Sequence, residues 1–271
     1  MPELPEVETT RRGISEHICQ LPIVGVTVRQ PKLRWPVPDN LSELLVGETF
    51  HSIERRAKYL LLTTSHGTLI IHLGMSGSLR ILSGHTQPEK HDHVDISFAN
   101  STVLRLRDPR RFGAILWSSS IPARHELLDD LGVEPLSQHF DGRYLYEKAR
   151  KRKVDIKQFI MNSHIVVGVG NIYASEALFL SGIRPTTPSH KISFPRMEKL
   201  TTAIKTVLRK AIKKGGTSLR DFTQSDGKPG YFKQSLNVYG REGEPCVQCG
   251  SPIKLIKQGQ RATYYCSKCQ K

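Results

Sequence analysis

YLLLTTSHGTLIIHL, residues 59–73, holds two runs of mostly apolar residues on either side of a polar turn. Ser65-His66-Gly67 supplies that turn, so the stretch predicts an antiparallel β-hairpin. Similar short stretches separated by turn signals continue from about residue 23 to 117, which predicts an antiparallel sandwich or barrel. The predicted strands are Ile23–Arg29, Thr49–Ile53, Tyr59–Thr63, Thr68–Leu73, Val94–Phe98, Val103–Arg107 and Ala114–Trp117.

A helix is predicted before this sheet. Pro5 suits the first turn of a helix, and Val7, Ile14 and Ile18 recur on one helical face. Cys19 ends the same stretch and is interpreted as a small buried apolar residue within the helix.

Helical patterns replace the strands from about residue 125 onward. Tyr173–Ser181 predicts a short helix that ends at Gly182. A longer helix is expected to start at Ser193 as N-cap and to end at Gly215-Gly216, with an apolar face at regular spacing. The order along the chain is therefore strands first and helices second.

Four of the five cysteines stand as Cys246-x2-Cys249, sixteen residues, then Cys266-x2-Cys269. Two such pairs can direct four thiolates to one tetrahedral ion, which predicts one structural Zn²⁺ and no catalytic metal. The stretches around Gly259 alternate as two short strands, so we expect a zinc-ribbon hairpin. A redox-active set of cysteines is the alternative interpretation, and the doubled spacing favours zinc.

The charge of the chain indicates its class of partner. Lys and Arg number 40 against 25 Asp and Glu, the net charge is +15, and the sequence pI is about 9.7. Such a chain is expected to bind a polyanion. No apolar run reaches the roughly 18 residues of a spanning helix, and acidic residues instead of an apolar signal segment stand near residue 1. Nucleic acid, a cytoplasmic location and no membrane are therefore predicted.

The first residues allow an unusual chemistry. If Met1 is removed, Pro2 presents a secondary amine, and an α-amine is deprotonated at lower pH than a lysine side chain. A secondary amine that adds to the C1′ carbon of a sugar gives a cationic iminium, which acidifies the neighbouring carbon and favours β-elimination. Glu3 lies next to this amine in the sequence and is a candidate proton shuttle. The alternative interpretation is that this segment only begins a helix, with acidic residues in the first turn.

Blocks of sequence along the whole chain resemble the bacterial formamidopyrimidine-DNA glycosylases. The resemblance runs in the family's order from residue 2 to residue 271. The blocks are Pro2 to Thr9, Arg55 to Leu60, His72 to Gly77, Lys90 to Asp95, Asp108 to Gly113, Val167 to Tyr173, Ser225 to Tyr231, and the cysteine module with Gln260 to Thr263.

The resemblance implies an enzyme that excises oxidised purines such as 8-oxoguanine from damaged duplex DNA and then nicks the abasic site by β,δ-elimination. It implies a multi-domain α+β fold with an N-terminal β-sandwich at 1–133, a helix-two-turn-helix domain at 134–236 and the zinc hairpin at 237–271. A monomer associated with the nucleoid is the simplest expectation.

The resemblance also implies roles for particular residues. Pro2 resembles the Schiff-base nucleophile, Glu3 its acid/base partner, and Lys58 the lysine near the lesion. Segment 217–231 resembles the loop that closes over the damaged base. Arg261 resembles the catalytic arginine that binds the phosphates at the lesion. The implied DNA contacts are His72, Met75, His91, Arg110, Phe112, Arg152, Asn171 and Tyr239.

Three of these contacts form a group with one function. Met75, Arg110 and Phe112 resemble the residues that fill the gap left by the everted nucleotide, which agrees with the need to refill a base stack after base flipping. Burial of Met75 and Phe112 in the core is the alternative from residue type alone. Turn residues beside both favour loop tips.

Two positions depart from the family pattern. Arg152 stands where the family has lysine at a DNA contact, which keeps the charge and changes the geometry. Residues 161–164 lack the acidic residue of the family, so no site is assigned there. Two other functions stay open: an endonuclease VIII-like enzyme for oxidised pyrimidines, which Leu4 disfavours because glycine is expected there, and a non-catalytic zinc-ribbon DNA-binding protein.

Overall fold

The computed structural model describes residues 2–119, 125–216 and 236–271. Contacts between backbone positions divide the chain into two units. Unit 1 comprises Met1–Asp129 and Lys214–Lys233, and unit 2 comprises Asp130–Lys213 and Gln234–Lys271. Within the described residues, no helix is long and apolar enough to cross a bilayer.

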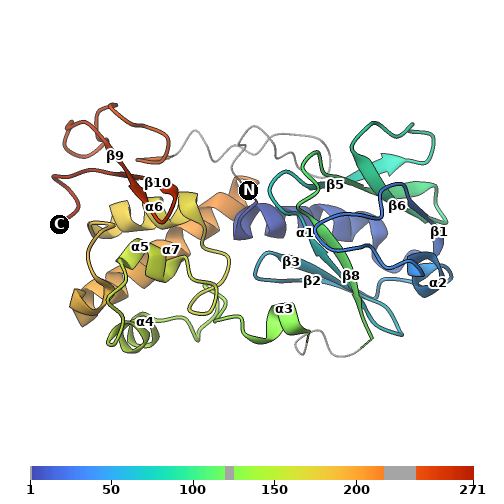
Figure 1. Ribbon diagram of the computed structural model, residues 1–271, viewed down its shortest axis with the longest axis horizontal. Helices are drawn as coiled ribbons and strands as arrows, with labels where there is room; N and C mark the ends of the chain where they lie inside the picture. Colours follow the sequence, from blue (N-terminus) through green and yellow to red (C-terminus); the bar gives the residue numbers. More distant parts are fainter. Residues whose placement is uncertain (1, 120–124, 217–235) are drawn as a thin grey trace. The chain divides into compact units, whose positions relative to one another are not determined.

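Unit 1 contains helix α1 and two four-stranded antiparallel sheets (Figure 1). One sheet has the order β1-β6-β7-β5 and the other β2-β3-β4-β8. The elements are α1 (Leu4–Ile18), β1 (Ile23–Val28), α2 (Leu41–Leu45), β2 (Ser52–Arg56), β3 (Tyr59–Thr63), β4 (Thr68–His72), β5 (Ser78–Ser83), β6 (Asp92–Phe98), β7 (Thr102–Arg107), β8 (Ala114–Ser118) and α3 (Glu126–Asp129).

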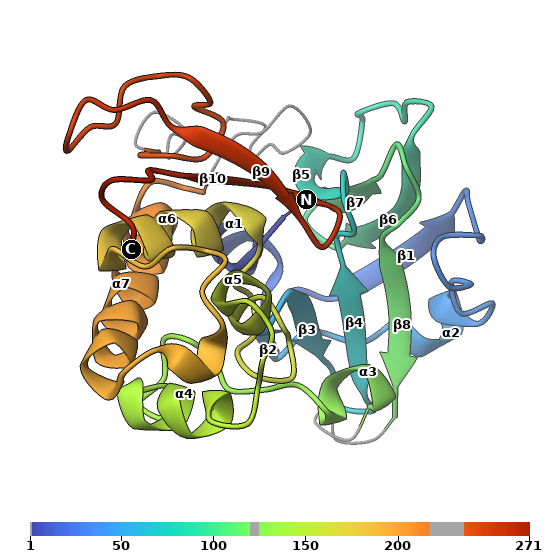
Figure 2. The same cartoon turned by 60° about the vertical axis from the view of Figure 1, so that its left-hand side comes forward.

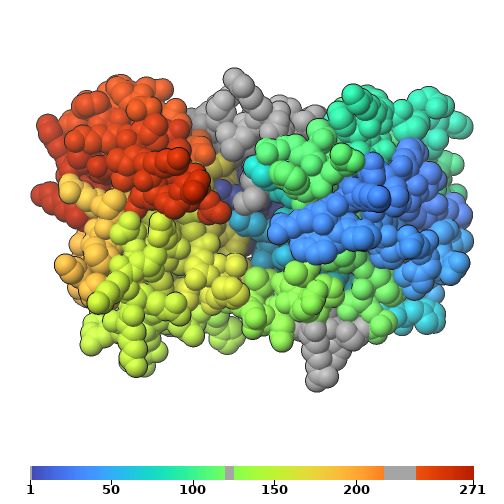
Figure 3. All heavy atoms as spheres, in the orientation of Figure 1, coloured from blue at the N-terminus to red at the C-terminus, as the bar shows by residue number. Residues whose placement is uncertain are grey.

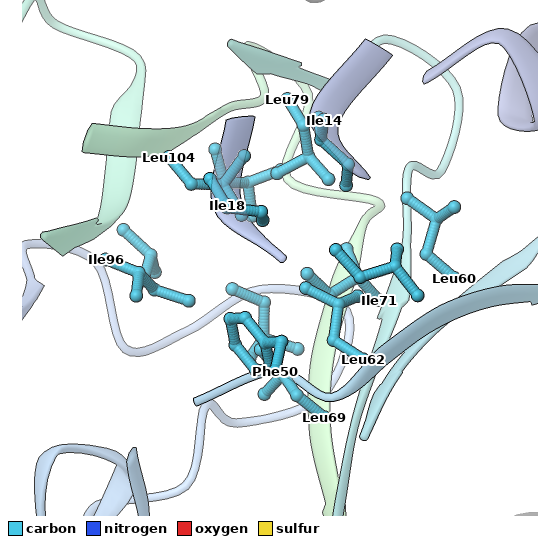
Figure 4. Close-up of a cluster of buried hydrophobic side chains, with 14 of the residues drawn as sticks. Ile14, Ile18, Phe50, Leu60, Leu62, Leu69, Ile71, Leu79, Ile96 and Leu104 are labelled. Atoms are coloured by element: carbon cyan, nitrogen blue, oxygen red, sulfur yellow. The ribbon is translucent and has the colours of Figure 1, made fainter. Parts of the chain in front are cut away.

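Side chains from both sheets and from α1 share one hydrophobic core. Figure 4 shows Ile14 and Ile18 of α1 beside Leu79 and Leu104 of one sheet and Leu60 and Ile71 of the other. The predicted apolar face of α1 is confirmed, because Val7, Ile14 and Ile18 are all buried.

The antiparallel β architecture is confirmed, with three local differences. The strand predicted at Thr49–Ile53 lies at Ser52–Arg56. Strand β5 was not predicted, because Ser78–Ser83 has adjacent apolar residues instead of strict alternation. Cys19 is not inside the helix: it is the C-cap of α1, is half-buried, and packs against the edge of the core.

Unit 2 contains the helices and the C-terminal hairpin. They are α4 (Gly142–Ala149), α5 (Ile156–Ile160), α6 (Asn171–Ser181), the 3-10 turn Ser189–Lys191, α7 (Phe194–Lys213), β9 (Lys254–Gln258) and β10 (Arg261–Tyr265). Helix α6 ends at Gly182 in the left-handed conformation, as predicted. Figure 2 shows the β9–β10 hairpin beside α6, and the cysteine module forms the red surface in Figure 3.

Candidate functional site

The N-terminal end of α1 brings Pro2 and two carboxylates together. Glu3 is the N-cap, and its backbone N–H donates to Oε2 of Glu6 at 2.9 Å in a reciprocal capping box. Glu3 and Glu6 are only 3% and 2% exposed, and Pro2 is buried as well. The backbone of Gly216 lies against the Glu6 side chain. A potential amine nucleophile therefore lies at the positive end of a helix, beside groups that can exchange protons.

Lys58 occupies the two-residue turn between β2 and β3. The preceding residue, Ala57, has a positive φ of 55°. Arg55 of β2 donates from Nη1 to the Ala57 carbonyl at 2.8 Å and from Nε to Oε2 of Glu8 on α1 at 3.3 Å. Through Arg55, the turn that carries Lys58 is therefore linked to α1, and the first turn of α1 follows Pro2 directly.

His72 lies in β4 directly opposite Tyr59 of β3, with ring centroids 4.8 Å apart. The Gly74 N–H donates to Nδ1 of His72 at 3.0 Å. Burial, together with the positive charges of Lys58 and Arg34, lowers the pKa of His72 to about 4. The ring is therefore neutral near pH 7, with its proton on Nε2, and it offers a hydrogen-bond donor near Lys58.

Met75, Arg110 and Phe112 lie on two adjoining loops. Phe112 is 45% exposed and Met75 is half-buried, so the structure contradicts the alternative of Phe112 as a core residue. The Arg110 guanidinium carbon lies 5.2 Å from the centre of the Phe112 ring. The loops meet backbone to backbone: a Cβ on Gly74, whose φ is 63°, would lie 2.4 Å from the Phe112 carbonyl carbon.

His91 precedes β6 and is half-buried, with its ring centre 6.5 Å from that of His93. The His93 Nε2 donates to the carbonyl oxygen of Asp108 at 2.8 Å. His72 and His93 thus use a ring nitrogen in hydrogen bonds to the backbone. Among the described residues, the only group suited to a metal ion is the set of four cysteines.

In unit 2, Asn171 at the start of α6 lies against the zinc hairpin. Its Nδ2 donates to the carbonyl oxygen of Ala262 at 3.0 Å and lies 3.5 Å from the Tyr239 hydroxyl. Ala262 follows Arg261 in β10. The structure therefore groups Asn171, Tyr239 and the strand that carries Arg261.

Lys157 links these elements and was not identified from the sequence. It is 1% exposed, and its Nζ donates to Oδ1 of Asn171 at 2.5 Å and to Oγ1 of Thr263 at 2.6 Å. A lysine on a short helix is normally solvated, so residue type gave no signal. Its buried charge is stabilised by partners on α6 and β10.

Glu176 of α6 is a second residue that sequence reasoning missed. It is 1% exposed, and its carboxylate accepts hydrogen bonds from the backbone N–H groups of Asn237, Val238 and Tyr239 at 2.8–2.9 Å. These bonds anchor the segment that presents the Tyr239 side chain.

A pocket of about 310 Å³ opens in unit 2 between α5 and the hairpin. Its lining combines two cationic side chains with polar amides. The lining residues are Lys157, Gln158, Met161, Asn162, Gln258, Gly259 and Arg261. Arg152 does not belong to this group: its exposed side chain follows α4, its backbone N–H donates to the Ala149 carbonyl, and its own carbonyl accepts from Ser189 and His190.

The four cysteine sulfurs lie within 4.8 Å of one another. Cys246 and Cys269 are 3.9 Å apart and Cys249 and Cys266 are 3.5 Å apart at Sγ. A tetrahedral zinc with Zn–S bonds of about 2.3 Å requires sulfurs about 3.8 Å apart, whereas a disulfide requires about 2.0 Å. The predicted site for one structural zinc ion is therefore confirmed.

The pKa values of two of these thiols are shifted in opposite directions. Hydrogen bonds from Ser251 lower the pKa of Cys249 to about 6, whereas burial and the neighbouring sulfurs raise that of Cys269 to about 12. Four thiolates this close need a positive ion between them.

The hairpin turn places Arg261 at the end of the zinc module. Both turn residues, Gly259 and Gln260, have positive φ, the geometry of a tight hairpin turn. The φ of 49° at Gly259 favours glycine, and a Cβ there would lie 2.8 Å from Nε2 of Gln158, the far end of a side chain that can move aside. The loop predicted at 217–231 and Met1 lie outside the described residues.

Three family models match the chain in order. They are the formamidopyrimidine-DNA glycosylase N-terminal domain at residues 1–115, the formamidopyrimidine-DNA glycosylase H2TH domain at 131–223, and the zinc finger found in FPG and IleRS at 243–271. Curated relatives named formamidopyrimidine-DNA glycosylase include those of Syntrophotalea carbinolica (57% identity), Methylococcus capsulatus (56%) and Nitrosococcus oceani (53%). Each alignment covers 100% of both chains.

Solved structures agree with these matches. Wild-type Lactococcus lactis Fpg in complex with an N7-benzyl-Fapy-dG containing DNA has 35% identity and a TM-score of 0.91, with 99% of each chain covered. The Lactococcus lactis Fpg complex with an abasic site containing DNA has 34% identity, a TM-score of 0.91 and the same coverage. This agreement over the full length in sequence, domain order and fold shows that the chain belongs to the formamidopyrimidine-DNA glycosylase family.

Proposed function

We propose that this chain removes oxidised purines from damaged duplex DNA and cleaves the resulting abasic site, with the Pro2 amine as nucleophile after loss of Met1. The observation that carries the proposal is the burial of Pro2 beside Glu3, at the positive end of α1, in a chain of this family. Family membership favours this activity over the endonuclease VIII-like and non-catalytic alternatives.

The chemistry proceeds in two stages. The Pro2 nitrogen forms a bond to C1′ of the sugar while the C1′–N bond to the base breaks, and the base leaves with a proton. The C1′–O4′ bond then breaks, O4′ takes a proton, and the nitrogen lone pair of Pro2 forms the C=N bond of a cationic iminium on the opened sugar. Loss of a proton from C2′ drives cleavage of the C3′–O bond, and the 3′ phosphate departs; a second elimination releases the 5′ phosphate.

Glu3 and Lys58 handle protons in this scheme. Glu3 is the nearest carboxylate to Pro2 in the sequence and is almost fully buried, which suits a group that exchanges protons away from water. Lys58, held by the Arg55 hydrogen bond to its turn, supplies a positive charge beside the neutral His72.

Other residues bind the backbone of the DNA and fill the gap. His72, His91, Arg152, Asn171, Tyr239 and Arg261 contact phosphates, and Met75, Arg110 and Phe112 enter the base stack. Phosphate contacts hold the duplex without reading its sequence. Exposed Phe112 with the Arg110 guanidinium over its ring suits an apolar wedge beside a base-pairing donor.

The protein acts as a monomer on damaged DNA in the cytoplasm, at the nucleoid. Zinc shapes the hairpin and takes no part in the chemistry. The division at 133/134 and 236/237 separates the catalytic, helix-two-turn-helix and zinc segments.

Borohydride trapping tests the nucleophile. Met1-free, zinc-loaded protein is mixed with duplex DNA containing 8-oxoguanine opposite cytosine, without added divalent metal, and reduced. The iminium becomes a stable amine, and peptide mapping by mass spectrometry is expected to place the sugar on Pro2. Pro2→Gly is expected to slow adduct formation strongly.

Protein that retains Met1 serves as the matched control. It is expected to bind duplex DNA normally and to form no adduct. Trapped sugar on another residue, or full activity with Met1 retained, would overturn the proposal.

A further inference from the structure

The chain crosses between the two sheets of unit 1 at two neighbouring places. Residues 73–77 connect β4 to β5, and residues 108–113 connect β7 to β8. Because β4 pairs with β8 (His72 opposite Ala114) and β5 pairs with β7 (Ser78 opposite Arg107), the two crossing segments lie side by side. They carry Met75 on one segment and Arg110 with Phe112 on the other.

Asp108 joins these two segments through its side chain. Its Oδ1 accepts a hydrogen bond from the Ser76 hydroxyl at 2.8 Å and lies 3.3 Å from the Arg110 N–H. Its Oδ2 accepts from the Gly113 N–H at 2.7 Å. One carboxylate thus binds Ser76, which follows Met75, and the backbone N–H groups of Arg110 and Gly113 on either side of Phe112.

The backbone of Asp108 reaches a third segment. Its N–H donates to the His91 carbonyl at 3.0 Å, and its carbonyl accepts from Nε2 of His93 at 2.8 Å. Asp108 therefore contacts all three segments of unit 1 that carry Met75, His91, Arg110 and Phe112.

The environment of Asp108 is unusual for a carboxylate. It is 0% exposed and has no ion-pair partner among the described residues. Asp95 of β6, also buried, instead pairs with Arg105 at 2.7 Å and Arg29 at 2.6 Å. A buried carboxylate without a cation is costly, and here hydrogen-bond donors on loop segments offset that cost.

We propose that Asp108 is a positioning residue that holds Met75, Arg110 and Phe112 in the arrangement that refills the base stack. This inference rests on the proposed function and extends it to a residue that touches no DNA. The three wedge side chains come from two crossings without regular secondary structure, and the Asp108 carboxylate replaces the rigidity that a sheet would provide.

Asp108→Asn tests the role with almost no change in shape. An amide has one acceptor oxygen, so whichever way it turns, its NH₂ faces either the Gly113 N–H or the Arg110 N–H. At least one segment then loses its bond. Ser76→Ala removes one of the donors and leaves the carboxylate in place, which gives a second, milder variant.

Two substrates separate positioning from chemistry. The first is duplex DNA with 8-oxoguanine opposite cytosine, which needs the wedge. The second is a single-stranded oligonucleotide with an abasic site, which has no stack to refill and reports only on the Pro2 amine. Single-turnover rates of borohydride trapping are measured on both.

Asp108→Asn is expected to lower the duplex rate about tenfold or more while the single-strand rate stays within about twofold. Phe112→Ala shows how much the duplex rate falls when the wedge side chain is removed. Adding Asp108→Asn to this variant is expected to lower the duplex rate little further. Ser76→Ala is expected to show the same selectivity with a smaller loss.

Asp95→Asn is the matched control: it removes a carboxylate that is only 5% exposed and does not contact the crossings, and its ratio of duplex to single-strand rates is expected to match wild type. An unchanged ratio in both Asp108→Asn and Ser76→Ala, or an equal change in Asp95→Asn, would overturn the inference. Failure of wild-type protein to trap either substrate at Pro2 would instead overturn the proposed function.

Discussion

Asp108 and Glu176 show how single buried residues shape this protein. Both carboxylates are at most 1% exposed, and both accept hydrogen bonds from backbone N–H groups of segments that carry proposed DNA contacts. Hydrogen bonds from several N–H groups stabilise a carboxylate much as a cation does. Each residue thereby orders an irregular segment and leaves the neighbouring cations available to phosphates.

At the residue scale, His72 predicts a pH-dependent stability. Its pKa is lowered to about 4 in the folded protein, against 6.5 for the free group. The folded state therefore binds fewer protons than the unfolded chain between these values. Stability is complete above pH 6.5 and is lost as the pH falls toward 4, by up to about 3 kcal/mol.

His72→Gln keeps an acceptor for the Gly74 N–H and cannot titrate. We expect its loss of unfolding free energy between pH 7.5 and pH 5 to be smaller than that of wild type by about 2 kcal/mol. Both tryptophans, Trp35 and Trp117, lie in unit 1, so their fluorescence in urea reports this unit. His85→Gln, in an exposed loop, should keep the wild-type slope; the same slope in His72→Gln would contradict the prediction.

Lys157 is predicted to stabilise unit 2. Lys157→Met keeps the length of the side chain and leaves Asn171, Ala262 and Thr263 without their shared donor. We expect a loss of about 2 kcal/mol or more in unfolding free energy, measured by far-ultraviolet circular dichroism in urea. Lys153→Met, at an exposed position, should change stability by less than about 0.5 kcal/mol. Equal effects of the two substitutions would exclude a structural role for the buried ammonium.

At the element scale, the Glu8–Arg55 pair fixes the β2–β3 hairpin on α1. Burial alone would raise the pKa of Glu8, but hydrogen bonds from Arg11 and Arg12 and the charge of Arg55 lower it. The carboxylate therefore stays charged, and Arg55 in turn holds the carbonyl of Ala57 in the turn with Lys58.

Arg55→Ala is expected to slow trapping of a single-stranded abasic site about tenfold, because Lys58 is displaced relative to α1. Arg12→Ala removes an exposed partner of the same carboxylate and is expected to leave the rate within about twofold. Single-turnover trapping measures both. Equal rates for the two variants would show that the hairpin needs no tether.

At the scale of the whole molecule, the net charge of +15 predicts a strong dependence of DNA binding on salt. Two cations are proposed to contact phosphates: Arg152 and Arg261. The logarithm of the binding constant should then fall against the logarithm of salt concentration with a slope of about −2 or steeper. Arg261→Ala should make the slope shallower by about 1, and fluorescence anisotropy at several salt concentrations measures it. A slope unaffected by this substitution would remove Arg261 from the interface.

Zinc removal is predicted to act on one unit only. The four thiolates lie in unit 2, and without the ion their repulsion opens the β9–β10 hairpin. Chelation should weaken binding to duplex DNA while the tryptophan fluorescence of unit 1 stays unchanged. Unaltered affinity after complete zinc loss would mean that the hairpin does not contact DNA.

Short-range sequence patterns were sufficient to predict much of the fold. The helix at Leu4–Ile18, the antiparallel strands, the end of α6 at Gly182 and the zinc ribbon follow from periodicity, turn residues and cysteine spacing. Strand β5 was missed, because its pattern is irregular and its partners in β7 lie 19 to 29 residues away in sequence. The exposure of Phe112 could be argued from its turn neighbours, whereas its contact with the Gly74 loop could not.

By itself, the sequence determined which elements form, that four thiolates meet at one ion, that the partner is a polyanion, and which family the chain resembles. Only the tertiary structure revealed Asp108, Glu176, Lys157 and the neutral state of His72. The reason is physical: a charged side chain in sequence looks solvated, and its burial is stable only because donors, acceptors and charges from distant segments converge on it. Such convergence depends on strand pairing and loop crossing, which local patterns do not encode.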